Sequence, residues 1–286
     1  MKRFDRPESD ADQALIYKRT KERDIKMEFR PPLTKVWEKA PVYVIIPGGG
    51  WSRAVAVDML GFSALSVEAL RKEGWAVASL EYRTAAENGV KMDTIVSDIM
   101  DAGRYLSKYR KELGIDPFRI VTSGHSAGGH LALMMALAPQ EAYTVDSPFD
   151  PVKDRFGVVA SAPISAPTIL WKDSVGFLPD PFAVDHLFPD GDYAKSAHRN
   201  SPYDYITPLS VPTLMAYGTH DNLVYAESSV RFYEKCRSVG APCELCGSVY
   251  GGHCFEPMVE GKTSDPDFEG VQKIITDFVR RFAPKG

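Results

Sequence analysis

The chain has 286 residues, of which 44% are hydrophobic and 25% charged, and its formal net charge is -4. These values are typical of a globular protein with a large core rather than of a disordered, fibrous or membrane chain. Because the Lys and Arg residues are scattered and the net charge is negative, no positive field for polyanions exists, and we expect no nucleic-acid partner.

The N-terminal residues 1–13 are polar and lack the apolar core and cleavage site of a signal peptide. No apolar run approaches the ~18 residues that a membrane-spanning helix needs. The sequence therefore predicts a cytoplasmic location and no membrane partner.

The cysteines are too few for a disulfide scaffold in a chain of this length, so we expect reduced thiols. All four lie near the C-terminus: Cys236, Cys243, Cys246 and Cys254. Cys243 and Cys246 have the C-x-x-C spacing of metal ligands, but they fall in a predicted strand and no second ligand pair is nearby. We expect no metal site.

The first third of the chain predicts an edge hairpin followed by a β-α-β unit. Residues 14–32, interrupted by prolines, suit an opening β-hairpin at a sheet edge. Residues 42–47 and 75–82 are short apolar runs typical of buried parallel strands. Between them, residues 54–73 have apolar side chains at helical spacing and stop at Gly74, a natural helix end.

The same alternation continues to the C-terminus and predicts an α/β fold, a mostly parallel sheet covered by helices on both faces. A single domain over residues 1–286 is expected, with a cap-like insertion at about 164–209 where the alternation breaks. The predicted strands are 119–123, 157–163, 212–218 and 244–250, and the predicted helices are 92–113, 226–239 and 268–282.

A candidate nucleophile lies in the motif Gly124-His125-Ser126-Ala127-Gly128, which has the form G-x-S-x-G. The motif directly follows a predicted strand and precedes a predicted helix, the context in which it marks a catalytic serine. A serine at such a tight turn projects from the sheet, and larger residues in place of the glycines would clash. The alternative is a glycine-rich turn that contains a serine by chance.

A second glycine-rich segment, Pro47-Gly48-Gly49-Gly50-Trp51, closes the first buried strand. Backbone N–H groups of such a loop can point at a developing oxyanion. The alternative is a plain flexible loop.

The serine needs a base, and after this kind of turn the partners follow in the order Ser, acid, His. Of the six histidines only His253 lies downstream of a strand-terminal acid in a separate loop. The best acid is Asp221, just past the strand at 212–218, where it would orient His253 and stabilise its charged form. Asp185 and Asp204 are weaker rivals, and Asp221 could instead serve only as a turn or helix-cap residue.

Together PGGGW, GHSAGGH, GTHDNLV and GGH resemble the esterase and lipase branch of the α/β-hydrolases. They are especially similar to the bacterial carbohydrate esterases described as acetyl xylan or feruloyl esterase-like. The resemblance covers about residues 17–282, nearly the whole chain in the expected order.

The resemblance implies that Ser126 is the nucleophile, Asp221 the orienting acid and His253 the base. It also implies that the N–H groups of Gly49, Gly50 and Ala127 form the oxyanion hole. In one respect the sequence departs from the related proteins, because Pro47 stands where their loop usually begins with His. We expect activity to survive, since the glycine backbones supply the donors.

The substrate that the resemblance implies is a small-molecule or oligosaccharide ester with a short acyl group, such as an acetyl group on a sugar, cleaved by water without a cofactor. Trp51, His125 and Trp171 are candidates to line the substrate site, since aromatic faces suit both acyl and sugar groups. Core or cap packing is the alternative for each.

Two other functions remain open at this stage. The same residues could cleave amides, as in formamidases and prolyl-oligopeptidase-like peptidases, although no propeller-sized domain precedes the motifs. The chain could also be a non-catalytic binding protein that retains the fold, because a fold alone never proves an activity.

Overall fold

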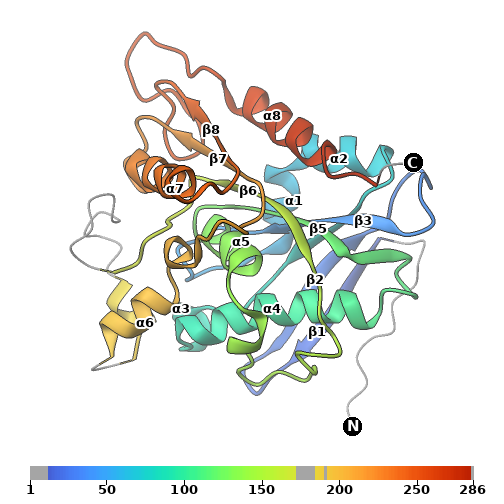
Figure 1. Cartoon of the computed structure of the whole chain (residues 1–286). Helices are drawn as coiled ribbons and strands as arrows, with labels where there is room; N and C mark the ends of the chain where they lie inside the picture. The colour runs from blue at the N-terminus through green and yellow to red at the C-terminus, as the bar shows by residue number, and fades with distance from the viewer. Residues whose placement is uncertain (1–11, 172–183, 190–191, 285–286) are drawn as a thin grey trace.

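The computed structural model describes residues 12–171, 184–189 and 192–284. At its centre is a sheet of eight strands in the order β1-β2-β4-β3-β5-β6-β7-β8 (Figure 1). β1 (Gln13–Arg19) and β2 (Asp24–Arg30) form an antiparallel hairpin at one edge, as predicted.

The rest of the sheet is parallel apart from the antiparallel pairing of β2 with β4, which confirms the predicted α/β class. All seven residues of β3 and all five of β4 are buried, because helices cover both sides of these strands. The remaining strands are β3 (Ala40–Ile46), β4 (Ala76–Leu80), β5 (Ile115–His125), β6 (Val158–Ile164), β7 (Thr213–Gly218) and β8 (Cys243–Ser248).

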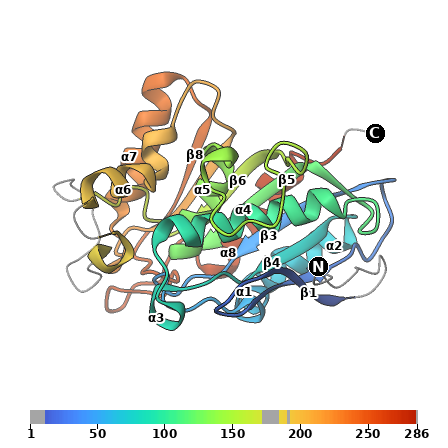
Figure 2. The ribbon, with the colours of Figure 1, turned by 90° about the horizontal axis from the view of Figure 1, so that it is seen from below.

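Helices cover the two faces of the sheet in two groups (Figures 1 and 2). One face carries α1 (Ala56–Phe62), α2 (Ala64–Lys72) and α8 (Phe268–Arg280). The other carries α4 (Met92–Lys108), α5 (Ala127–Leu137) and α7 (Ala226–Val239). Short helices fill the connections: α3 (Ala85–Asn88), α6 (Tyr193–Arg199) and the 3₁₀ turns Gln140–Ala142, Val184–Leu187 and Pro202–Tyr205.

Two predicted helices differ in extent from the observed ones. The helix expected over 54–73 is interrupted at Ser63, which separates α1 from α2. Gly61 weakens the helix just before this point and serine favours helix ends over interiors, so the periodicity of the apolar residues hid the break. The helix expected over 92–113 ends at Lys108, and turns lead from there to β5.

The insertion predicted at 164–209 contains α6 and two of the 3₁₀ turns. Residues 172–183 and 190–191 of this predicted segment lie outside the described residues. Among the helices of the described ranges, none is long and apolar enough to cross a membrane.

The parallel strands direct several loops to one edge of the sheet. The segments after β3, β5, β7 and β8 all begin at the carboxyl ends of parallel strands, and those ends meet at the same edge. Residues from four distant parts of the sequence are therefore close enough to form one site.

Candidate active site

Ser126 lies at the turn between β5 and α5, in a backbone conformation that non-glycine residues rarely adopt (φ 56°, ψ -121°). A side chain at Gly124 would meet the carbonyl oxygen of Gly128 at 2.4 Å, and one at Gly128 would meet that of Ile46 at 2.0 Å. The predicted need for glycine at both positions is confirmed, because only glycine lets the turn fit between β3 and α5. This packing holds Ser126 in its strained conformation.

Asp221 and His253 form a buried pair at the same edge. His253 Nδ1 lies 2.7 Å from Asp221 Oδ2, and both residues are at most 8% exposed. Asp221 Oδ1 accepts hydrogen bonds from the N–H groups of Leu223 and Val224 at 2.8 and 2.9 Å. Asp221 thus stabilises a turn and also orients His253, so both of the roles that the sequence allows for it are present.

Of the two other candidate acids, Asp204 pairs with a different histidine, His198. Its carboxylate lies 2.7 Å from His198 Nδ1 and accepts a hydrogen bond from the indole of Trp171. The side chain of Asp185 lies outside the described residues. Asp221 is therefore the acid that the structure brings to His253.

The loop that carries His253 is held by the side chains of Ser165 and His125, and Ser165 belongs to none of the sequence motifs. The main-chain carbonyl of His253 accepts hydrogen bonds from Ser165 Oγ at 2.9 Å and from His125 Nε2 at 3.0 Å. The rings of His125 and His253 lie 4.6 Å apart. Ser165 directly follows β6. Its position at the carboxyl end of a strand is the only feature of the sequence that could have indicated a role in the site.

The glycine loop lies directly against the nucleophile turn. A side chain at Gly48 would meet Ser126 Cβ at 3.3 Å, and the next residues have positive φ, 117° at Gly49 and 59° at Gly50. Such a run of left-handed residues turns successive N–H groups toward one side. The loop is thus shaped to present backbone donors next to Ser126.

The start of α5 adds a further donor. Ala127 is the first residue of this helix, so its N–H has no carbonyl partner within the helix. The N–H of Ser126 itself is already used, because it donates to the carbonyl of Ile164 at 2.8 Å. This leaves Ala127 rather than Ser126 to face an oxyanion.

Two side chains, those of Tyr82 and Trp51, anchor the glycine loop. The Tyr82 hydroxyl donates to the Pro47 carbonyl at 3.0 Å. The Trp51 indole Nε1–H donates to His130 Nδ1 at 3.2 Å, and His130 Nε2 lies 2.7 Å from the Asn200 carbonyl. Since a carbonyl only accepts, His130 carries its proton on Nε2 and bridges the loop, α5 and the insertion.

This arrangement corrects one expectation. Trp51 was expected to line the substrate site, but its side chain is 2% exposed and is held by His130 in the core. Core packing, the alternative for Trp51, is the observed arrangement, because its indole is hydrogen-bonded to the fully buried His130.

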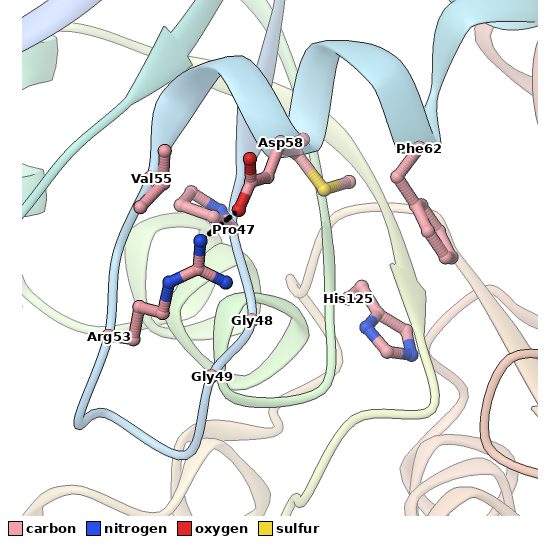
Figure 3. A pocket seen from close by; sticks show the side chains of 9 residues that line it. Pro47, Gly48, Gly49, Arg53, Val55, Asp58, Phe62 and His125 are labelled. Carbon is pink, nitrogen blue, oxygen red and sulfur yellow. Dashed lines mark ion pairs between the residues drawn. The ribbon is translucent and has the colours of Figure 1, made fainter.

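The other two candidate substrate residues lie in different places. Trp171 packs against His198 and Tyr203 within the insertion. His125 lines a pocket of about 160 Å³ beside the glycine loop, with its ring stacked on Phe62 (Figure 3).

The four thiols are free. Cys243 and Cys246 lie on β8, the strand expected for them. Within the described ranges no group of three or more His, Cys, Asp or Glu side chains is arranged to hold a metal ion.

A mostly parallel sheet with a strained serine before a helix, and an acid and a histidine after later strands, defines the α/β-hydrolase fold. The family model described as BD-FAE matches residues 30–236 of this chain. The chain belongs to the BD-FAE family.

Curated relatives include esterases and lipases. The chain is 26% identical to esterase LipC of Mycobacterium tuberculosis over 273 residues, which cover 87% of this chain and 62% of that protein. It is 35% identical to lipase 2 of a Moraxella species over 123 residues, covering 42% and 26% of the two chains. The aligned part is thus less than two thirds of either relative.

Solved structures share the fold along nearly the whole chain. The apo form of Thermogutta terrifontis esterase 2 is 24% identical, with a TM-score of 0.77 and 98% of each chain covered. The butyrate-bound form of this thermophilic esterase is 25% identical, with a TM-score of 0.75 and 96% of each chain covered.

Proposed function

We propose that this protein is a serine carboxylic ester hydrolase that works through an acyl-enzyme on Ser126. The observation that supports it most is the convergence of three elements at one sheet edge: the strained turn of Ser126, the buried pair of Asp221 and His253, and the glycine loop packed against Ser126. A turn that contained serine by chance would not require the other two.

The proposed mechanism follows from the hydrogen bonds of His253. Because Asp221 Oδ2 accepts only, His253 donates from Nδ1 and leaves the lone pair of Nε2 free to act as a base. Nε2 takes the hydroxyl proton of Ser126 as Oγ attacks the ester carbonyl, and the Asp221 carboxylate stabilises the imidazolium that forms.

The tetrahedral oxyanion would be bound by the N–H groups of Gly49, Gly50 and Ala127. Collapse breaks the bond to the leaving oxygen, which takes the proton from His253 Nε2 and departs as an alcohol. Water, deprotonated by the same nitrogen, then attacks the acyl-enzyme, and the carboxylic acid leaves as Ser126 regains its proton. Every proton movement uses His253, so the cycle requires no cofactor.

For the substrate, we propose an ester of a short acyl group, in particular an acetyl group on a sugar or oligosaccharide. The likeness to a butyrate-bound esterase structure supports a short acyl chain.

The test is to incubate the purified protein with a fluorophosphonate probe and locate the adduct by mass spectrometry. The same preparation is assayed with p-nitrophenyl esters of increasing chain length, with acetylated sugars and with matched anilides. Labelling of Ser126 and a preference for acetyl esters are expected. Faster turnover of the anilides would favour an amidase instead.

The first prediction concerns Ser126→Ala, which we expect to lower kcat by about 10⁴-fold or more and to abolish labelling, because no other group can form the acyl-enzyme. Thermal unfolding should show that the variant is folded. Unchanged turnover in the variant, or the absence of both labelling and turnover in the wild type, would contradict the proposed mechanism.

A further inference from the structure

The pocket beside the glycine loop has walls of different chemistry (Figure 3). Gly48 and Gly49 form one wall, and Met59 and Phe62 of α1 add apolar surface. Its volume is about 160 Å³, and the exposed side chains of Arg53 and Asp58 at its rim leave it open to solvent.

His125 gives this pocket a hydrogen-bond acceptor of fixed direction. Its Nε2 lies 3.0 Å from the His253 carbonyl, which can only accept, so the proton resides on Nε2 and Nδ1 is the acceptor. Burial and the charge of His253 lower the pKa of His125 to about 4, so the ring is neutral at pH 7. Within the described part of the chain, Nδ1 makes no hydrogen bond, and it lies beside Gly48 in the pocket wall.

Arg53 and Asp58 supply a donor and an acceptor on the other side of the pocket (Figure 3). Arg53 lies in the loop that leads to α1 and Asp58 in the first turn of α1, and their ion pair measures 2.8 Å. The two side chains are 66% and 54% exposed, so solvent occupies their remaining hydrogen-bonding positions. A ligand in the pocket must replace that solvent.

The charge of the pocket selects between classes of ligand. Arg53 and Asp58 neutralise each other, and the other lining residues carry no charge, so neither an anion nor a cation is favoured. An alkyl group would displace water from the ion pair and return no hydrogen bonds, which is unfavourable. A neutral group with neighbouring hydroxyls would satisfy the guanidinium, the carboxylate and His125 Nδ1 together.

The position of the pocket indicates which half of an ester it receives. It meets the proposed site at the glycine loop, which would hold the carbonyl oxygen, and at His125, whose ring contacts that of His253. In the proposed cycle His253 gives its proton to the leaving alcohol. A group in this pocket therefore contacts His125, whose ring packs against the residue that protonates the alcohol oxygen.

We propose that this pocket binds the alcohol half of the substrate and that Asp58, with Arg53 and His125 Nδ1, selects alcohols that carry hydroxyls next to the ester. The inference rests on the proposed ester hydrolysis and assigns specificity residues to it. Phe62 and Met59 would pack against the carbon skeleton while the polar groups bind the hydroxyls.

Two acetates with the same number of alcohol carbons test the proposal. Acetate release is measured for glycerol 1-acetate and propyl acetate, and each kcat/KM is divided by the rate constant of hydroxide hydrolysis to remove intrinsic reactivity. We expect the wild type to prefer glycerol 1-acetate by about ten-fold, the size expected for a hydrogen bond to a charged group. Asp58→Ala should bring this ratio close to one.

Glu68→Ala is the matched control, because Glu68 is another exposed carboxylate, paired with Lys72 on α2, that does not line the pocket. This variant should keep the wild-type ratio. p-Nitrophenyl acetate, whose leaving group has no free hydroxyl, reports whether the catalytic residues of each variant remain intact.

Two results would overturn the inference and leave the proposed function standing. In the first, the wild type hydrolyses p-nitrophenyl acetate but has equal corrected kcat/KM values for glycerol 1-acetate and propyl acetate. In the second, Asp58→Ala keeps the wild-type preference for glycerol 1-acetate. Equal losses on both alkyl acetates in Asp58→Ala would also overturn it, because hydroxyl selection would then not depend on Asp58. No hydrolysis of any ester, without fluorophosphonate labelling of Ser126, would overturn the proposed function and this inference together.

Discussion

Two histidines follow each other closely in the chain around Ser126, yet they belong to regions of different kinds. His125 faces the pocket beside the glycine loop, whereas His130 lies in the core behind that loop. Burial lowers the pKa of both to about 4, and each has Nε2 next to a main-chain carbonyl, of His253 and of Asn200.

The difference is at the other ring nitrogen. His130 Nδ1 accepts the indole N–H of Trp51, so the ring is fully satisfied and links three segments. His125 Nδ1 faces the pocket beside Gly48. Both residues are histidines close to the same motif, so residue type and position do not distinguish them. What distinguishes the anchoring histidine from the one available to a ligand is whether the second ring nitrogen has a partner.

Replacing each histidine by alanine should give the largest contrast between the two regions. His130→Ala leaves a cavity and two buried polar groups without partners, the Trp51 N–H and the Asn200 carbonyl, and we expect a loss of about 4 kcal/mol in the free energy of unfolding. His125→Ala should cost about 1.5 kcal/mol, since its site is partly open. Urea denaturation measures both, and equal losses would show that the two regions do not differ as proposed.

The pH dependence of stability isolates the contribution of His130 when the wild type is compared with a variant that lacks its ring. Its folded-state pKa is lowered from 6.5 to about 4 by burial, so the fold favours the neutral ring. The stabilisation is complete above pH 6.5, decreases as the pH falls because the unfolded chain binds the proton first, and is lost at about pH 4. A shift of this size corresponds to about 3 kcal/mol.

His130→Gln removes the titrating ring and keeps a donor and an acceptor. Between pH 6.5 and 4, the free energy of unfolding should therefore fall by about 3 kcal/mol more in the wild type than in the variant. His125 titrates in both proteins and cancels in the comparison. Urea denaturation at a series of pH values provides the measurement, and parallel curves would show that the environment of His130 does not hold it neutral.

The elements of the sheet and the residues of the site were predictable to the extent that they depend on local patterns. β3 and β7 are continuous apolar runs, and Ser126 is marked by glycines that the turn itself requires. Asp221 and His253 could be chosen because loops after parallel strands meet at one edge, which chain order alone indicates.

Other features depend on contacts between distant segments, which a single sequence does not reveal. Lys18 has the appearance of a surface residue, but it is fully buried, where it pairs with Asp98 and Asp101 at 2.8 Å each. Phe62 is the last residue of α1 and stacks on His125, but the apolar periodicity concealed the break that follows at Ser63. The pocket and the contacts of His130 likewise depend on residues that are far apart in the sequence.

The smallest expected effect concerns Trp51, which links His130 to the glycine loop. Trp51→Phe keeps the ring but removes the N–H, so His130 Nδ1 becomes a buried acceptor without a partner at a cost of about 1–2 kcal/mol. Because Trp51 directly follows Gly49 and Gly50, we also expect a loosened loop to stabilise the oxyanion less well and to lower kcat by about ten-fold, with little change in KM.

Trp75→Phe is the matched control for this last prediction. Trp75 is fully buried in the core cluster that includes the α8 side chains, on the sheet face opposite α5, and it lies outside the glycine loop. Its replacement should reduce stability and leave kcat unchanged, since destabilisation alone does not move the oxyanion donors. If both variants lowered kcat equally, the loss would reflect general loosening, and the anchor behind the loop would have no separate part in catalysis.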